Sequence, residues 1–222
     1  MRLGHIGQQR IDRLAKEGML GQIEMISLPT CENCLKGKMA RKPFRTGTRS
    51  EFPLQLIHSD ICGPMNVRAR HGGRYFITFI DDYTRYSHIY LISHKSDALA
   101  CFKKFITLCE NQLDRKVKAL RTDRGREYLS DEFKQMCEEK GILRQLTIPY
   151  TPQQNGVAER RNRTLLEMVR SMMAQANLPI NFWGDALLTA AYILNRVPSK
   201  SVSSTPYELW TNRKPDLNNL RP

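Results

Sequence analysis

The order of apolar runs along the chain is the feature that most limits its fold. Five runs have the length and composition of β-strands, and they cover residues 54–61, 75–82, 88–92, 117–122 and 142–148. Segments with helical periodicity separate the last three runs, and Ser96 and Ser130 are placed to cap two of these helices. Asn155 is predicted to cap the helix that follows it, and Pro179 opens a further helix. This order predicts an α/β fold with a mixed five-stranded sheet flanked by helices.

Three acidic residues stand at the ends of these elements. Asp60 and Asp123 each close an apolar strand run, and Glu159 lies in the first turns of the helix after Asn155. The three carboxylates are therefore predicted to converge at one edge of the sheet. Three carboxylates can hold two divalent cations about 3.5–4 Å apart, and carboxylate oxygens suit Mg²⁺ or Mn²⁺. An Asp, a distant Asp and a Glu separated from the second Asp by 35 residues are typical of polynucleotidyl transferases.

Other acidic residues compete for the same role. Asp81 and Asp82 end another strand run, and Glu127 lies four residues after Asp123. An aspartate at a strand end is commonly a cap or a turn residue. We therefore assign Asp81, Asp82 and Glu127 structural or supporting roles rather than a place among the three main carboxylates.

The sequence motifs around the acidic residues resemble those of a known family. The segments are HSDICGPM, RYFITFIDDYTRY, LRTDRGREY, IPYTPQQNGVAERRNRTLLEMVRSM and LPINFWGDALLTAAYILNRVPSK. In this order they closely resemble the integrase segment of copia-type LTR retrotransposon polyproteins. The resemblance implies a ribonuclease-H-like fold and an enzyme that joins the 3′ ends of element DNA to target DNA. It also implies that Asp60, Asp123 and Glu159 are the catalytic residues and the ligands of two Mg²⁺ or Mn²⁺ ions.

The segment around the third acid is predicted to contact DNA. The stretch PYTPQQNG is rich in loop-forming residues. The resemblance implies that Tyr150, Gln153 and Asn155 meet the DNA end of the element. Arg163 is one helical turn beyond Glu159 and therefore lies on the same helix face. Its guanidinium can bind a phosphate there with two hydrogen bonds. The alternative for Arg163 and its basic neighbours is a solvated helix face.

The start of the chain resembles a zinc-binding appendage. GHIGQQRIDRL and CENCLKGKMARKPF resemble the pre-integrase region that precedes such cores. The implied Zn²⁺ ligands are His5, Cys31 and Cys34, and a structural zinc site takes four ligands. The family's fourth ligand, a His shortly before RLGH, is absent from the printed chain, so the site is predicted to be incomplete and the region truncated. The predicted division is an appendage at 1–35, a basic linker at 36–53 and a catalytic core at 54–222.

Charge and cysteine content limit the partners. The formal net charge is +13, which favours a polyanion, with nucleic acid ahead of a membrane surface. The six cysteines show no disulfide framework, and no apolar run is long enough to span a membrane. The resemblance implies a homo-oligomer when active, with the active form in the nucleus after a cytoplasmic particle. The alternative is an inactive or domesticated nucleic-acid-binding relic, favoured by Arg124 and Arg126, where similar elements usually carry Asn and Gly.

Overall fold

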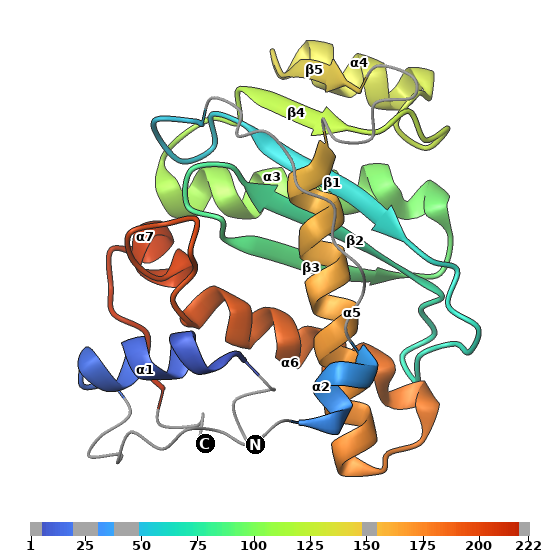
Figure 1. The fold of residues 1–222 in the computed structure, drawn as a ribbon. Helices are drawn as coiled ribbons and strands as arrows, with labels where there is room; N and C mark the ends of the chain where they lie inside the picture. The colour runs from blue at the N-terminus through green and yellow to red at the C-terminus, as the bar shows by residue number, and fades with distance from the viewer. Residues whose placement is uncertain (1–5, 20–30, 38–48, 148–154, 218–222) are drawn as a thin grey trace. The chain divides into compact units, whose positions relative to one another are not determined.

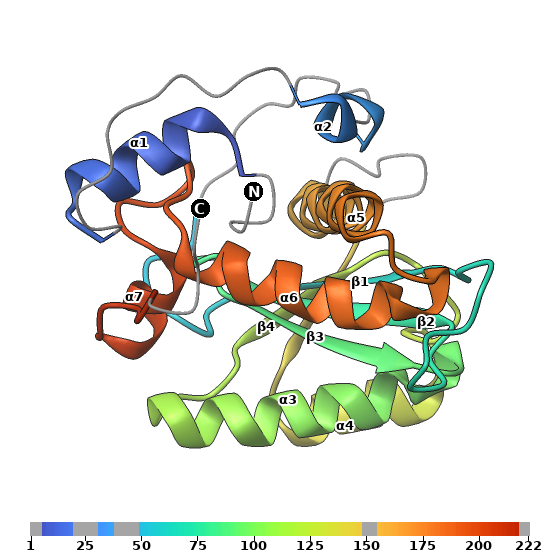
Figure 2. The ribbon, with the colours of Figure 1, turned by 90° about the horizontal axis from the view of Figure 1, so that it is seen from below.

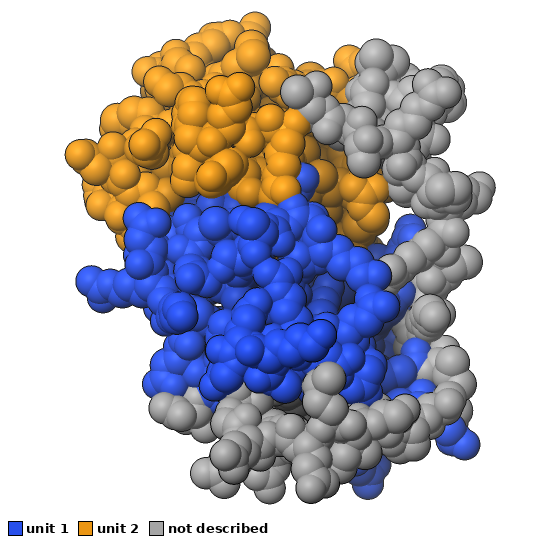
Figure 3. Space-filling model, turned by 60° about the vertical axis from the view of Figure 1, so that its left-hand side comes forward, with its two compact units in different colours: residues 1–41, 84–86, 163–222 blue, residues 42–83, 87–162 orange. Residues whose placement is uncertain are grey.

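The structure, a computed structural model, describes residues 6–19, 31–37, 49–147 and 155–217. The chain divides into two compact units, coloured separately in Figure 3. One unit comprises residues 42–83 and 87–162 and holds the sheet. The other comprises residues 1–41, 84–86 and 163–222 and is helical. The predicted boundaries at residues 35 and 53 stay predictions.

A five-stranded mixed sheet forms the centre of the first unit (Figure 1). Its strands are β1 (Ile57–Cys62), β2 (Tyr75–Asp81), β3 (Ser87–Ile92), β4 (Ala119–Thr122) and β5 (Leu143–Leu146). The order across the sheet is β3-β2-β1-β4-β5. Strands β1, β2 and β3 pair antiparallel, whereas β4 runs parallel to both β1 and β5. The predicted mixed five-stranded sheet is therefore confirmed.

Two helices, α3 (Ala98–Leu113) and α4 (Asp131–Glu139), cover the same face of this sheet (Figure 2). Aromatic side chains fill the space between the layers. The ring of Phe79 stacks on Phe105 at 4.7 Å and on Phe102 at 5.5 Å, and Phe102 stacks on Phe133 at 5.4 Å. All four rings are at most 1% exposed. Their burial contributes to the hydrophobic stabilisation of this unit.

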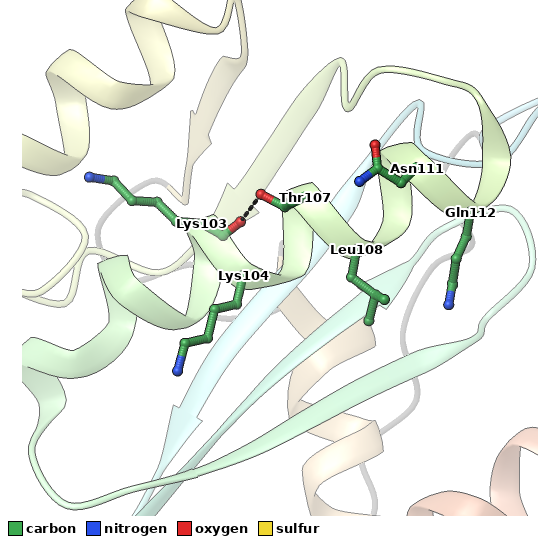
Figure 4. A pocket seen from close by; sticks show the side chains of 6 residues that line it. All are labelled: Lys103, Lys104, Thr107, Leu108, Asn111 and Gln112. Atoms are coloured by element: carbon green, nitrogen blue, oxygen red, sulfur yellow. Dashed lines mark hydrogen bonds between the residues drawn. The ribbon is translucent and has the colours of Figure 1, made fainter.

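The outward face of α3 is polar around one apolar side chain. Six residues line a shallow pocket there, namely Lys103, Lys104, Thr107, Leu108, Asn111 and Gln112 (Figure 4). The Thr107 hydroxyl donates to the Lys103 carbonyl at 3.0 Å, and Leu108 is 42% exposed. All six residues belong to one helix, so the pocket is a surface feature of α3.

Helix caps are confirmed in part. The Ser130 hydroxyl accepts from the Phe133 N–H at 3.3 Å and caps α4 as predicted. The prediction for Ser96 is wrong, because residues Lys95–Asp97 form a 3₁₀ turn that leads into α3. There the Asp97 carboxylate accepts from the His94 N–H at 3.0 Å. Helix α3 therefore begins at Ala98 without a side-chain cap.

The segment before β1 is held by the two aspartates at the end of β2. The Asp81 carboxylate accepts from the Leu54 N–H, and the Asp82 carboxylate accepts from the Ser50 N–H, both at 2.7 Å. The second Asp82 oxygen lies 2.9 Å from the His58 ring. Leu54 adopts a positive φ of 65°, so the strand predicted from residue 54 begins only at Ile57. These bonds give Asp81 and Asp82 a structural role.

The helical unit contains five α-helices within the described residues. They are α1 (Gln8–Lys16), α2 (Glu32–Gly37), most of α5 (Gly156–Ala176), α6 (Trp183–Arg196) and α7 (Pro206–Thr211). The 3₁₀ turn η3 (Ile180–Phe182) precedes α6. Residues 156–162 of α5 belong to the sheet unit, so this one helix runs from one unit into the other. In the described part of the chain, no helix combines the length and apolarity needed to cross a membrane.

His88 makes a partly buried polar pair beneath α3. Its Nε2 atom lies 3.5 Å from the Cys109 sulfur, and its ring packs edge-on against Phe105. Burial lowers the pKa of His88 to about 4 and raises the pKa of the Cys109 thiol. At neutral pH the thiol therefore donates to an uncharged imidazole. None of the six cysteines, all of which lie in the described ranges, forms a disulfide.

This pair makes the fold sensitive to acid. The unfolded chain takes up the His88 proton near the ordinary pKa of 6.5, whereas the folded chain does so only near 4. Stability is therefore lost as pH falls from 6.5 towards 4, by up to about 1.4 kcal/mol per pH unit. His88→Gln is expected to flatten the fall in melting temperature across this window. The exposed His71→Gln is the control, and equal slopes in all three proteins would contradict the assignment.

Candidate active site

The first two acidic residues are brought together by strand pairing. Asp60 lies on β1, where it is opposite Thr78 of β2. Parallel pairing aligns Ile57 of β1 with Leu120 of β4, so the same register carried three residues further brings Asp60 level with Asp123. Asp123 directly follows the carboxyl end of β4. Two carboxylates 63 positions apart in sequence therefore meet at one edge of the sheet.

The turn after β4 orients Asp123. The exposed Asp123 carboxylate accepts from the Gly125 N–H at 3.1 Å. Glu127 instead lies 3.6 Å from the Lys95 amine, and its side chain is only 8% exposed. These contacts separate the two acids of this turn, because Asp123 stays accessible while Glu127 is occupied by a lysine.

The third acidic residue comes from the start of α5. Glu159 is half-buried in the first turns of the helix. Asn162, three residues later and therefore on a neighbouring part of the same helix face, donates its amide N–H to the Asp60 carboxylate at 2.9 Å. This hydrogen bond brings the Glu159 face of α5 to Asp60.

The pKa of Asp60 shows that the three carboxylates influence one another. Burial and the negative charge of Asp123 raise the pKa of Asp60 to about 7, and the charge of Glu159 acts in the same direction. The Asn162 amide opposes the rise because it stabilises the ionised form. Mutual repulsion of this kind is relieved when a cation binds among the carboxylates.

The donor set fits a hard divalent cation. All three side chains offer carboxylate oxygens, the ligands that Mg²⁺ and Mn²⁺ prefer. Within the ranges that the structure describes, no three His, Cys, Asp or Glu side chains are gathered tightly enough to hold a metal ion by themselves. The three carboxylates are therefore neighbours that do not form a tight cluster.

Comparison with known proteins assigns the chain to a family. Residues 51–152 match the model of the integrase core domain, and residues 1–39 match that of the GAG-pre-integrase domain. The retrovirus-related Pol polyprotein from transposon TNT 1-94 of Nicotiana tabacum is 41% identical over 222 residues, which is 99% of this chain. The chain belongs to the integrase region of retrotransposon Pol polyproteins.

Other relatives agree with this assignment. The Pol polyprotein from transposon RE1 of Arabidopsis thaliana is 28% identical over 194 residues, which is 86% of this chain. The chain spans 17% of the length of the tobacco polyprotein and 13% of the Arabidopsis one. It therefore corresponds to a small portion of each of these longer proteins.

Solved structures show the same fold. A chain of the simian T-cell lymphotropic virus intasome, solved with a PP2A regulatory subunit, matches with a TM-score of 0.61 and 20% identity. The match covers 98% of this chain and 74% of that one. The HTLV-2 integrase catalytic core domain in complex with magnesium matches with a TM-score of 0.54 and 18% identity, covering 73% and 99% of the two chains. The predicted ribonuclease-H-like fold is confirmed.

The predictions for the residues expected to contact DNA differ in how they compare with the structure. Tyr150 and Gln153 lie outside the described residues. Asn155 is only 1% exposed, and its amide donates to the Ser59 carbonyl at 2.9 Å, so in this structure it binds β1. The prediction that Asn155 caps α5 is wrong, because its Oδ1 atom accepts no hydrogen bond from any described residue. Arg163 is half-buried on α5, one turn after Glu159.

The two arginines beside Asp123 face outward. Arg124 and Arg126 are both exposed. Neither forms an ion pair with Asp123 or Glu127 in the described part of the chain, which removes one of the ways in which they were expected to disturb the site. The carbonyls of Gly125 and Arg126 accept hydrogen bonds within the turn and fix its path.

The predicted zinc ligands are seen only in part. Cys31 and Cys34 flank the first turn of α2, and their thiols are close enough to hydrogen-bond. A backbone hydrogen bond from Cys34 lowers the pKa of Cys31, whereas burial raises the pKa of Cys34. The Ser171 hydroxyl of α5 donates to the Asn33 carbonyl at 3.3 Å and holds this turn. His5 lies outside the described residues, so the complete zinc site stays a prediction.

Sequence reasoning missed Asn162 and Tyr128. The buried Tyr128 hydroxyl lies 2.8 Å from the Ser59 hydroxyl, next to Asp60 in the chain. The available signal for Asn162 was its spacing, because an asparagine three residues after Glu159 shares a helix face with it and can donate an amide N–H to a carboxylate.

Proposed function

We propose that this chain catalyses DNA integration by joining the 3′ hydroxyl ends of copia-type retrotransposon DNA to target DNA. In this reaction each 3′ hydroxyl attacks a target phosphodiester in line, and the bond to the leaving 3′ oxygen breaks. No covalent enzyme intermediate is needed. The observation that carries the proposal is the placement of three carboxylates from β1, the end of β4 and the start of α5 near one another, through the β1–β4 pairing and the Asn162–Asp60 hydrogen bond.

The three carboxylates would hold two Mg²⁺ or Mn²⁺ ions. The bound ions would activate the attacking oxygen and stabilise the leaving oxygen. Asp60 and Asp123 would share ions, which their alignment across β1 and β4 supports, and Glu159 would add a ligand from α5. Asn162 donates to one Asp60 oxygen, Oδ2. The magnesium in the HTLV-2 core structure supports this choice of ion.

A strand-joining assay tests the proposal directly. The purified chain is incubated with duplexes that end in the element's terminal sequence and with plasmid target, in Mg²⁺, Mn²⁺, Ca²⁺ or EDTA. Joined products are expected in Mg²⁺ and Mn²⁺ only, because Ca²⁺ prefers longer bonds and more ligands than Mg²⁺. Joining that persists in EDTA would contradict a metal-dependent mechanism. Duplexes with scrambled ends serve as the control for end recognition.

The basic surface should make DNA binding sensitive to salt. Each neutralised phosphate contributes about 0.9 to the slope of log affinity against log salt. Arg163→Ala is expected to reduce that slope by about one and to weaken binding about threefold to fourfold more at 50 mM than at 200 mM salt. Equilibrium titration of a short duplex measures both. The exposed Lys134→Ala on α4 is the control, and an unchanged slope for Arg163→Ala would assign that arginine to the solvated face.

Partners and location follow from the proposed reaction. Two DNA ends must be joined together, so we propose that the active form is a homo-oligomer on element and target DNA. The HTLV-2 cores solved in dimeric and trimeric forms support oligomerisation. Joining to chromosomal DNA would take place in the nucleus, after assembly in a cytoplasmic particle. A Zn²⁺ ion on Cys31, Cys34 and His5 belongs to the same proposal.

The alternative function is a nucleic-acid-binding relic without catalysis. The observation that favours it is the pair of exposed guanidiniums, Arg124 and Arg126, beside the Asp123 carboxylate. Positive charge there opposes the binding of divalent cations and favours phosphate. This alternative predicts salt-dependent DNA binding with no joining in any metal, so the assay above separates the two functions.

A further inference from the structure

Two buried asparagines connect the start of α5 to β1. The Asn155 amide donates to the Ser59 carbonyl, and the Asn162 amide donates to the Asp60 carboxylate, each at 2.9 Å. The two acceptors belong to consecutive residues of β1, although the donors are 96 and 102 positions away in sequence. Glu159 lies between the two donors in the helix. The helix start is therefore attached to the strand on both sides of its catalytic carboxylate.

Both side chains are enclosed by protein. Asn155 is 1% exposed and Asn162 is 4% exposed. In each case the amide oxygen accepts no hydrogen bond from the described residues. A buried polar atom without a partner is costly. In both asparagines the unpaired amide oxygen destabilises the fold, whereas the amide N–H forms a hydrogen bond. The donated hydrogen bond is therefore the favourable contribution of these two side chains.

The acceptors give the two asparagines different effects. Asn155 binds a main-chain carbonyl, which anchors the helix but leaves every side chain of the site untouched. Asn162 binds the Oδ2 atom of Asp60. An ionised carboxylate only accepts hydrogen bonds, so this bond fixes the rotation of the carboxylate and turns its other oxygen away from the amide.

We propose that Asn162 is a positioning residue for the metal site, which holds the Asp60 carboxylate so that Oδ1 is presented to a divalent cation. The inference rests on the proposed function, because it takes Asp60 as a metal ligand. Groups that orient a metal ligand commonly change metal affinity about 10-fold to 100-fold when they are removed. Asn155 has the related but separate role of anchoring α5 through the backbone of β1.

Matched leucine variants separate the two roles. Leucine has the same number of side-chain heavy atoms as asparagine and a similar branched shape, so it removes the donor without leaving a cavity. The Mn²⁺ dissociation constant of the full chain is measured by electron paramagnetic resonance, which reports free Mn²⁺. Asn162→Leu is expected to raise this constant about tenfold, whereas Asn155→Leu is expected to leave it within about twofold. Equal weakening by both variants would assign the effect to helix anchoring and overturn the specific role of Asn162.

A double variant tests whether Asn162 acts through Asp60. In the Asp60→Asn background, Asn162→Leu is expected to cause no further loss of Mn²⁺ affinity, because the group that it orients has lost its charge. A further tenfold loss would overturn the proposal, as would unchanged affinity in Asn162→Leu alone. If Asp60→Asn itself leaves Mn²⁺ binding unchanged, the proposed metal site fails and the positioning role falls with it. If Asp60→Asn weakens Mn²⁺ binding but Asn162→Leu does not, only the positioning role is wrong and the proposed metal site is unaffected.

Discussion

Replacement of any one of the three acids by its amide is expected to reduce strand joining on the order of a thousandfold. Asp60→Asn, Asp123→Asn and Glu159→Gln keep the shape of the side chain but remove the charge that holds the divalent ions. Those ions contribute several kcal/mol of transition-state stabilisation, and each 1.36 kcal/mol corresponds to tenfold in rate. The measurement is the initial rate of strand joining in saturating Mg²⁺ and Mn²⁺. Full activity in one variant would remove that residue from the active site.

Two comparisons make the result specific. Glu127→Gln is the matched control, since this acid lies four residues after Asp123 but is paired with Lys95, and it is expected to join DNA at close to the wild-type rate. Asp60→Asn should also keep its melting temperature in the absence of metal. Its amide removes the repulsion from Asp123 and Glu159 that the carboxylate experiences. A large fall in melting temperature would mean that lost activity reflects lost folding.

Truncation of Phe79 is expected to cause a large loss of stability. This ring is fully buried at the centre of the cluster between the sheet and α3, in contact with Phe102, Phe105 and Tyr90. Phe→Ala changes at such sites cost about 3–5 kcal/mol. At about 2–4 °C per kcal/mol for a chain of this size, the melting temperature should fall by roughly 6–20 °C.

The control for Phe79→Ala is Leu108→Ala. Leu108 is also apolar but lies on the outward face of α3 and is 42% exposed. Its replacement is expected to change the melting temperature by less than about 2 °C. Thermal unfolding followed by circular dichroism measures both variants. Similar losses for the two would show that the core is not organised around Phe79.

Several features of this protein were determined by short stretches of sequence. The apolar runs that correspond to the five strands are visible in the local sequence. Asp60 and Asp123 stand out because each lies at the end of such a run. The Ser130 cap is equally local, since a hydroxyl and the N–H three residues later need only a helical turn to meet. Thr205 caps α7 in the same way. Patterns of period two or 3.6, and caps within one turn, depend on neighbours in the chain.

Other features were decided only by the tertiary structure. Asn155 looks like a cap and a DNA contact in sequence, yet its amide binds the Ser59 carbonyl 96 positions away. Asp82 resembles a further candidate ligand, yet its oxygens bind the Ser50 N–H and the His58 ring. A carboxylate or an amide has the same hydrogen-bonding groups wherever it occurs in the sequence. Which partner it finds depends on which distant backbone is folded against it, and here the register of β1 with β2 and β4 and the docking of α5 make that choice.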